Sequence, residues 1–203
     1  MKVIFLGCHS DDIELGCGGT IYKHREDWDI SCLVFCRKGK KQGAWHDISG
    51  VATRSLSKLG ARTVQVLDFE PDKFSDYRQD VYDHLARIKE LEQPCIVFTQ
   101  AADEHQDHVT LNQESLRVFR QQNMYEYLST YRSMRSFCPN TYEILDIEHV
   151  DAKVKAMQEY FEFYVEKKFM RPSAVMASMS QAGIYVGVDF CEAFRVVTKI
   201  NTV

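Results

Sequence analysis

The first half of this 203-residue chain alternates short apolar runs with stretches of helical length, and this alternation strongly constrains the fold. The apolar runs are near-continuous and rich in β-branched or aromatic residues, which is typical of strands buried on both faces. They span residues 3–6, 30–35, 64–67 and 95–98. Strands that alternate with helices predict a parallel sheet with helices on both faces and right-handed crossovers.

The second half of the chain shows a different pattern. The helices expected along the whole chain are 13–24, 48–59, 77–91, 109–119 and 150–169. Further strands are expected at 125–131, 141–147 and about 189–200. Because no linker or composition shift separates the halves, residues 1–203 are predicted to form one domain. We therefore expect an α/β fold, Rossmann-like and mainly parallel, with additional strands in its C-terminal part.

Composition narrows the class of protein. With 45% hydrophobic and 27% charged residues, the chain resembles an ordinary globular protein. Lys and Arg number 25 against 29 Asp and Glu, a net charge of −4, which argues against a general nucleic-acid binder. No apolar stretch is long enough to span a bilayer, and Met1 and Lys2 lead straight into a short apolar run without a leader pattern. A cytoplasmic location is expected, with the 7 cysteines reduced.

A first polar cluster follows the first apolar run, in His9-Ser10-Asp11-Asp12-Ile13-Glu14. Packed acids repel one another unless a cation or hydrogen-bond donors compensate their charge. An alternative is purely structural: Asp11 caps the following helix, Glu14 closes a capping box, and His9 is exposed. Capping by one acid leaves the other free for function.

A second polar cluster, Asp103-Glu104-His105-Gln106-Asp107-His108, follows the fourth apolar run. Each histidine taken alone could be an ordinary surface residue. However, the carboxyl ends of parallel strands open on the same edge of a sheet, so the two clusters are expected to converge. A convergence of His, Asp and His is a plausible divalent-metal site with an open coordination position.

These two clusters resemble the signatures of a known family. His9-Ser10-Asp11-Asp12 is similar to the His-Pro-Asp-Asp motif of the LmbE-like, or PIG-L-like, zinc-dependent N-deacetylases, and residues 103–108 are similar to their His-x-Asp-His motif. Segments 136–142 and 191–195 also resemble parts of that family. Ser10 and Ala101 depart from it, since each stands where proline is common; neither change removes a ligand.

The resemblance implies a role for each polar residue. It implies a Zn²⁺ ion, with Fe²⁺ as another divalent choice, bound by His9, Asp12 and His108. Asp11 would act as general base, and zinc together with His105 would stabilise the oxyanion. Asp107 is expected to orient His105 and to favour its charged form. The proton donor to the leaving amine stays open between Asp11 and His105.

The substrate class implied by the resemblance is a small N-acetylated amino-sugar conjugate, hydrolysed at its amide; its identity and the oligomeric state stay open. Aromatic side chains that could pack on a sugar are Trp45, Tyr142 and Tyr185, although core or rim positions suit each of them better; Trp45 is the strongest candidate of the three. Arg54 and Asp72 fit a solvated helix face and a turn better than a substrate contact. Residues 38–43 are expected to form a mobile, solvated loop.

Three other functions compete with the deacetylase. One is a catalytically silent sugar-binding module of the same fold. Another is a metallo-β-lactamase-like hydrolase, since residues 103–108 differ from its H-x-H-x-D-H motif at the first position only. The third is a nucleotide-dependent oxidoreductase, suggested by the glycines in residues 16–19, although they do not form a G-x-G-x-x-G pattern.

Overall fold

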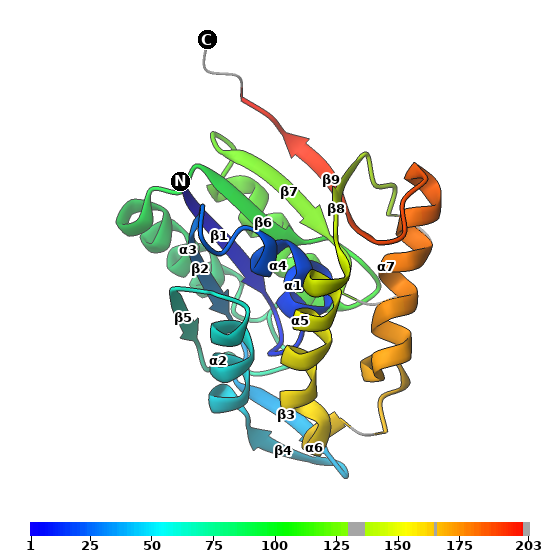
Figure 1. Ribbon diagram of the computed structural model, residues 1–203. Helices are drawn as coiled ribbons and strands as arrows, with labels where there is room; N and C mark the ends of the chain where they lie inside the picture. The colour runs from blue at the N-terminus through cyan, green and yellow to red at the C-terminus, as the bar shows by residue number, and fades with distance from the viewer. Residues whose placement is uncertain (130–136, 165, 201–203) are drawn as a thin grey trace.

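The computed structural model describes residues 1–129, 137–164 and 166–200, which fold around a seven-stranded sheet (Figure 1). The strands in spatial order are β5 (Thr63–Val66), β2 (Asp29–Val34), β1 (Lys2–Gly7), β6 (Ile96–Gln100), β7 (Asn123–Tyr127), β9 (Cys191–Thr198) and β8 (Thr141–Ile144). From β5 to β7 all neighbours are parallel, whereas β9 runs antiparallel to β7 and β8. The predicted α/β fold, with additional C-terminal strands, is confirmed.

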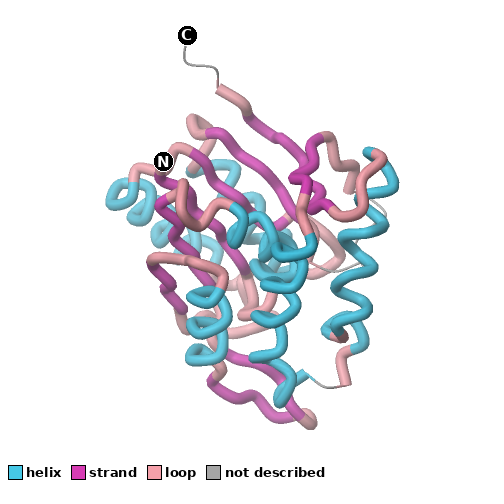
Figure 2. Tube along the Cα trace, viewed as in Figure 1, coloured by secondary structure: helices cyan, strands magenta, loops and turns pink. Residues whose placement is uncertain are grey.

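Helices cover both faces of the sheet (Figure 2). They are α1 (Asp12–Lys23), α2 (Ser49–Lys58), α3 (Arg78–Glu92), α4 (Gln106–Val118), α5 (Ile147–Met157), α6 (Phe161–Tyr164) and α7 (Pro172–Val186), with 3₁₀ turns η2 (Gln158–Tyr160) and η3 (Lys168–Met170). Helices α1, α2 and α5 pack together on one face, and α3 packs with α4 on the other. Among the described helices, none is long and apolar enough to cross a lipid bilayer.

The central strand β1 shows why its residues form a doubly buried strand. Val3 and Phe5 point into the core under α1 and α2, and Phe5 stacks on Phe98 of β6 with ring centroids 4.6 Å apart. Ile4 and Leu6 point to the opposite face, into the core under α3 and α4. Because successive side chains of a strand alternate between faces, a continuous apolar run supplies both cores.

The glycines of residues 16–19 lie inside α1 and not in a strand-to-helix turn. A Cβ atom on Gly16 would overlap the Tyr127 ring, and one on Gly19 would overlap the side chain of Leu145. These glycines allow α1 to approach β7 and its neighbours closely. Their placement does not match a dinucleotide-binding turn.

The expected loop at residues 38–43 is instead part of a β-hairpin. Strand β3 (Lys38–Lys41) pairs antiparallel with β4 (Ala44–Asp47). The two connecting residues, Gln42 and Gly43, have φ angles of 50° and 83°, as the tight turn of a two-residue hairpin requires. The prediction of a loop was wrong because cross-strand pairing to residues 44–47 outweighs the low strand propensity of the lysines.

The expected helix over residues 150–169 is also wrong in its extent. Helix α5 begins earlier, at Ile147, and ends at Met157; the chain then turns through η2, α6 and η3 before α7 begins at Pro172. Proline suits the first helical turn because its missing N–H has no intrahelical partner there. Helix α7 was not predicted. Residues 130, 131, 136 and 165 of the predicted segments lie outside the described residues.

Candidate active site

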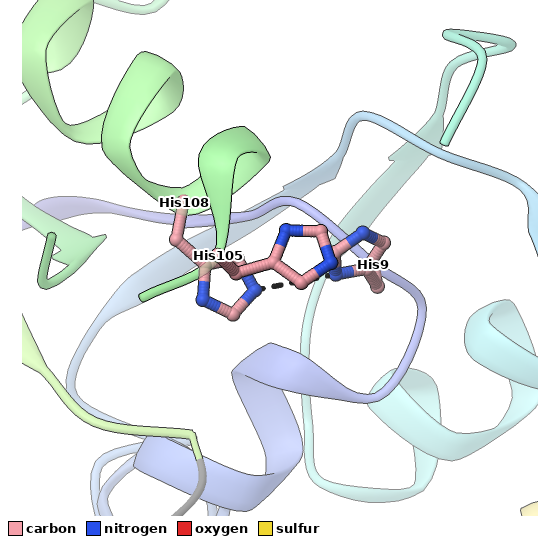
Figure 3. A group of neighbouring side chains, drawn as sticks. All are labelled: His9, His105 and His108. Carbon is pink, nitrogen blue, oxygen red and sulfur yellow. Dashed lines mark hydrogen bonds between the residues drawn. The ribbon is translucent and has the colours of Figure 1, made fainter. Parts of the chain in front are cut away.

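The two polar clusters converge at the carboxyl edge of the sheet (Figure 3). His9 follows β1, Asp12 begins α1, and His108 lies in the first turn of α4, directly after β6. Strands β1 and β6 are parallel neighbours, with Val3 opposite Ile96 and Phe5 opposite Phe98. The loops that leave these strands are therefore side by side, although about ninety residues separate them along the chain.

Three side-chain atoms form a compact triangle at this edge. Asp12 Oδ2 lies 3.2 Å from His9 Nδ1 and 3.6 Å from His108 Nε2, and the two ring nitrogens are 3.3 Å apart. Ligand atoms about 2.0–2.1 Å from a tetrahedral zinc ion are separated from one another by about 3.3 Å. The triangle thus fits the face of a tetrahedral site, with the fourth position open.

Each histidine of the triangle is oriented by a carboxylate. Asp103 Oδ2 lies 2.7 Å from His108 Nδ1, and Asp107 Oδ2 lies 3.2 Å from His9 Nε2. Such outer carboxylates fix the ring orientation and tautomer of metal-binding histidines. The sequence motif includes Asp103 but does not assign it a role. Only the fold determines which histidine its carboxylate contacts.

The Asp107 carboxylate, which was expected to orient His105, makes its hydrogen bonds elsewhere. Besides His9, its carboxylate accepts hydrogen bonds from the backbone N–H groups of Asp72 at 2.8 Å and Phe74 at 3.1 Å. The distance from Asp107 Oδ2 to His105 Nδ1 is 3.9 Å, too long for a hydrogen bond. The segment after β5 holds Asp107 toward His9, an arrangement that motif spacing does not reveal.

The surroundings of His105 act on its charge in opposite directions. Burial, together with the nearby His9 and His108, holds the pKa of His105 below its usual value, although Asp107 and Asp72 act in the opposite direction. Its Nδ1 accepts a hydrogen bond from the Asp107 backbone N–H at 3.2 Å. In the neutral ring the proton is therefore on Nε2, which lies 3.4 Å from Asp72 Oδ1 at the exposed side of the site.

The carboxylates of the site require a positive charge. Burial alone would lower the pKa of His9, but hydrogen bonds to Asp107 and Asp12 and the charges of Asp12 and Asp11 raise it to about 10. Burial would raise the pKa of Asp12, yet the His108 charge and the contacts with His9 hold it well below its usual value. A proton on His9 thus balances these acids, and a divalent cation on the triangle would balance them equally well.

Asp11 is buried beside the triangle and faces a different partner. Lys167 Nζ lies 3.7 Å from Asp11 Oδ2 and 3.4 Å from the centroid of the Tyr164 ring. The Asp11 side chain makes no hydrogen bond that caps α1, and Glu14 turns into the core toward Tyr160. The structural alternative of a capping box is therefore not found in α1. No motif marks Lys167, which lies between α6 and η3, far along the chain.

The remaining candidates are scattered. Asp72 has a positive φ of 64° and its carboxylate faces His105, so it borders the site after all. Arg54 pairs with Glu159 on an exposed helix face, 3.0 Å away. Trp45 is half-exposed on β4, whereas Tyr142 and Tyr185 line a cavity beside the site.

The cysteines beside the first motif behave as packing residues. Cys8 and Cys17 are fully buried, and burial raises the pKa of each thiol well above its usual value. Cys8 Sγ nevertheless lies close enough to Asp12 and His108 to form a second group of potential metal ligands. A neutral thiol is a poor ligand, so the His and Asp atoms of the triangle are the better donor set.

The chain is similar to known deacetylases. Residues 4–119 match the model of the PIG-L family, GlcNAc-PI de-N-acetylase. The chain is 26% identical over 168 residues to the uncharacterized deacetylase YaiS of Escherichia coli (strain K12), covering 78% of this chain and 89% of that protein. The solved structure of the conserved protein TT1542 from Thermus thermophilus superposes with a TM-score of 0.81 at 21% identity, covering 99% and 96% of the two chains. For the N,N'-diacetylchitobiose deacetylase from Pyrococcus horikoshii, the TM-score is 0.74 at 16% identity, covering 97% and 83%.

Proposed function

The chain belongs to the PIG-L family, and from this premise we propose that it is a metal-dependent hydrolase that removes the acetyl group from the amide nitrogen of a small N-acetylated amino-sugar conjugate. The observation that carries the proposal is the triangle of His9 Nδ1, Asp12 Oδ2 and His108 Nε2, whose edges of 3.2–3.6 Å match zinc coordination. The action of the P. horikoshii relative on diacetylchitobiose supports an N-acetylated sugar as the substrate class.

The triangle would hold Zn²⁺, or Fe²⁺ in its place. When bound, such an ion supplies Lewis acidity and lowers the pKa of water at the open position. Asp103 and Asp107 orient the two imidazole rings that would hold the ion. Oxygen and nitrogen donors suit both metals, so the ligand set does not distinguish between them. A measurement of the metal bound to the purified protein does.

Asp11 is the proposed general base. It is adjacent to a ligand in sequence but outside the triangle, so its carboxylate is available to accept a proton from the attacking water. Lys167 Nζ, 3.7 Å from Asp11 Oδ2, forms an ion pair with this carboxylate. The same carboxylate then returns the proton to the leaving amine.

His105 is the proposed oxyanion donor. Because its Nδ1 already accepts the Asp107 backbone N–H, a neutral His105 carries its proton on Nε2, where it can donate to the amide oxygen as negative charge develops. A neutral ring is a poor acid for the amine, which favours Asp11 as the proton donor over His105.

Two substitutions test the proposal. We expect Asp11→Asn to retain one metal ion per chain and to lower acetate release from N-acetylated glucosamine derivatives about 10²–10⁴-fold. His9→Ala should lose the metal itself, and Asp27→Asn, which changes an exposed acid, should match the wild type. Metal content by plasma mass spectrometry and released acetate are the readouts.

The outcomes separate the competing functions. If Asp11→Asn keeps wild-type turnover, the role of the base is wrong. If metal-loaded wild type releases no acetate from any sugar conjugate, a silent binding module replaces the enzyme. The metallo-β-lactamase alternative conflicts with the parallel sheet, since that fold places its motif after antiparallel strands.

A further inference from the structure

Gln100, the last residue of β6, carries a buried side-chain amide that none of the roles proposed above uses. The residue is fully buried at the carboxyl edge of the sheet, and its backbone carbonyl accepts a hydrogen bond of 2.9 Å from Asn112 Nδ2 in α4. A buried amide costs free energy unless its oxygen and its two hydrogens find partners. The partners of this amide therefore show what it can do.

The contacts of the Gln100 amide fix which of its two ends faces the candidate metal site. Its Oε1 lies 3.4 Å from the backbone nitrogen of Cys8, a group that can only donate. Its Nε2 lies 2.6 Å from Ser129 Oγ and 3.0 Å from His108 Nε2, one of the three atoms of the ligand triangle. The reversed amide would place two donors against each other at Cys8. The NH₂ group, and not the oxygen, therefore faces the triangle.

Both hydrogens of this NH₂ group have acceptors within the protein. One points to Ser129 Oγ and the other to His108 Nε2. Because Asp103 accepts a hydrogen bond from His108 Nδ1, the lone pair of the imidazole is on Nε2. The Gln100 amide and a metal ion thus compete for the same lone pair.

This competition has a consequence for the amide when an ion binds to the triangle. His108 Nε2 has a single lone pair, which the ion would use, so one Gln100 hydrogen loses its acceptor. His9 can release a proton to the solvent in the same event, but an amide cannot. A buried donor without an acceptor is unfavourable, so Gln100 then requires a new oxygen next to the ligand triangle.

We propose that Gln100 Nε2 donates a hydrogen bond to the carbonyl oxygen of the scissile amide and acts with His105 to stabilise the negative charge that develops there. The inference rests on the proposed function, which brings that oxygen to the open coordination position. An oxygen in the fourth tetrahedral position would be about 3.3 Å from His108 Nε2, and Gln100 Nε2 is 3.0 Å from the same atom. Donors held in place before the reaction are effective because they need no reorganisation as the charge forms.

The substitution Gln100→Leu removes the donor and approximately keeps the shape of the side chain. We expect it to lower kcat for an N-acetylglucosamine derivative about 10²–10³-fold with little change in KM. Zn²⁺ affinity, measured by chelator competition, should equal or exceed that of the wild type, because a competitor for His108 Nε2 is gone. Gln113→Leu, on the exposed side of α4, is the matched control and should behave as the wild type.

An inhibitor distinguishes a donor to the reacting oxygen from a residue that only supports the fold. A methylphosphonamidate of glucosamine carries tetrahedral oxygens, whereas glucosamine itself has none at this position. In Gln100→Leu the affinity for the phosphonamidate should fall by the same factor as kcat/KM, and the affinity for glucosamine should stay unchanged. Equal losses for both compounds would overturn the proposed role.

A second variant replaces Gln100→Leu if the latter does not fold. Gln100→Glu keeps an acceptor for the Cys8 N–H and for the Ser129 hydroxyl, but it places an oxygen where the NH₂ group was. It should bind Zn²⁺ more tightly than the wild type, because a carboxylate is itself a zinc ligand, and it should lose at least as much activity.

The remaining outcomes separate this inference from the proposed function. Wild-type kcat in either Gln100 variant overturns the donor while the deacetylase stands. Weaker Zn²⁺ binding by folded Gln100→Leu also overturns it, because Gln100 would then support the ion and not the substrate oxygen. If the metal-loaded wild type releases no acetate from any N-acetylated sugar, the proposed function fails, and the donor fails with it.

Discussion

This protein buries two groups of charged side chains, and the two groups differ in what balances their charge. Glu192 and Lys153 are completed by protein: the carboxylate accepts from Gly19, Thr20 and Lys153, and the ammonium also donates to the Leu15 carbonyl at 2.7 Å. At the carboxyl edge of the sheet, by contrast, His9 Nδ1, Asp12 Oδ2 and His108 Nε2 converge on one another. Both groups bury charge. Only in the candidate metal site do several potential ligand atoms point at one another.

The largest effect is expected when the Lys153–Glu192 pair is broken. Lys153→Met leaves Glu192 buried without its cation, which should lower the free energy of unfolding by about 3–5 kcal/mol. Folded protein should still bind metal with wild-type affinity. Urea denaturation measures the loss, and Lys155→Met on the exposed side of α5 should change stability by less than about 0.5 kcal/mol. Loss of metal affinity in folded Lys153→Met would show that the two groups are not independent.

The next prediction separates two residues within the metal-site group. His105→Ala should leave metal affinity within about twofold but lower kcat about 10²–10³-fold, because it removes an oxyanion donor. Asp107→Asn should instead weaken metal binding about 10–100-fold, because its carboxylate orients His9. Equal metal affinities in both variants would restore the view that Asp107 serves His105.

Glu14 is a third buried acid, and it differs from both groups because a bound proton neutralises it. The Tyr160 hydroxyl has one hydrogen but faces two oxygens, the Ser10 carbonyl and Glu14 Oε1. In both contacts the Tyr160 hydroxyl is the donor, so its single hydrogen can satisfy only one of the two oxygens at a time. Burial raises the pKa of Glu14 from its ordinary 4.5 to about 8, although the Tyr160 contact lowers it.

The sign of the resulting pH dependence follows from this raised pKa. Between pH 4.5 and about 8 the folded state holds a proton that the unfolded state has lost, so stability falls as pH rises. Glu14→Gln is neutral at every pH, so its free energy of unfolding relative to the wild type should rise by about 2.5 kcal/mol from pH 5 to pH 7. Urea denaturation of metal-free protein at both values measures this gain; the exposed substitution Glu90→Gln should show little of it. If the difference in unfolding free energy between Glu14→Gln and the wild type is the same at both pH values, Glu14 is ionised in the folded state.

The last prediction concerns Asp103, the carboxylate partner of His108. Asp103→Asn weakens the contact with His108 Nδ1 and should lower metal affinity about 10–100-fold in chelator competition. Glu104→Gln, an exposed change in the same loop, is the matched control. Unchanged affinity in Asp103→Asn would remove this carboxylate from the site.

Much of the site could be anticipated from residues close together in sequence. His9 and Asp12 are three residues apart in one loop, and residues 103–108 form another, so strand order and the geometry of parallel sheets suffice to bring them together. Helix α7 and the hairpin of β3 and β4 could not be anticipated in this way. Their sequences lack a strong periodic pattern, and contacts with other elements stabilise them.

By itself, the sequence determined the α/β class and the edge of the sheet at which polar residues gather, because apolar periodicity and loop position are local properties. Tertiary structure alone decided which carboxylate meets which imidazole, that Lys167 faces Asp11, and that Tyr160 reaches Glu14 across 146 residues. Such pairings depend on angles and distances between packed elements, to which hydrogen bonds respond within a few tenths of an ångström. A linear pattern of residues does not contain that information.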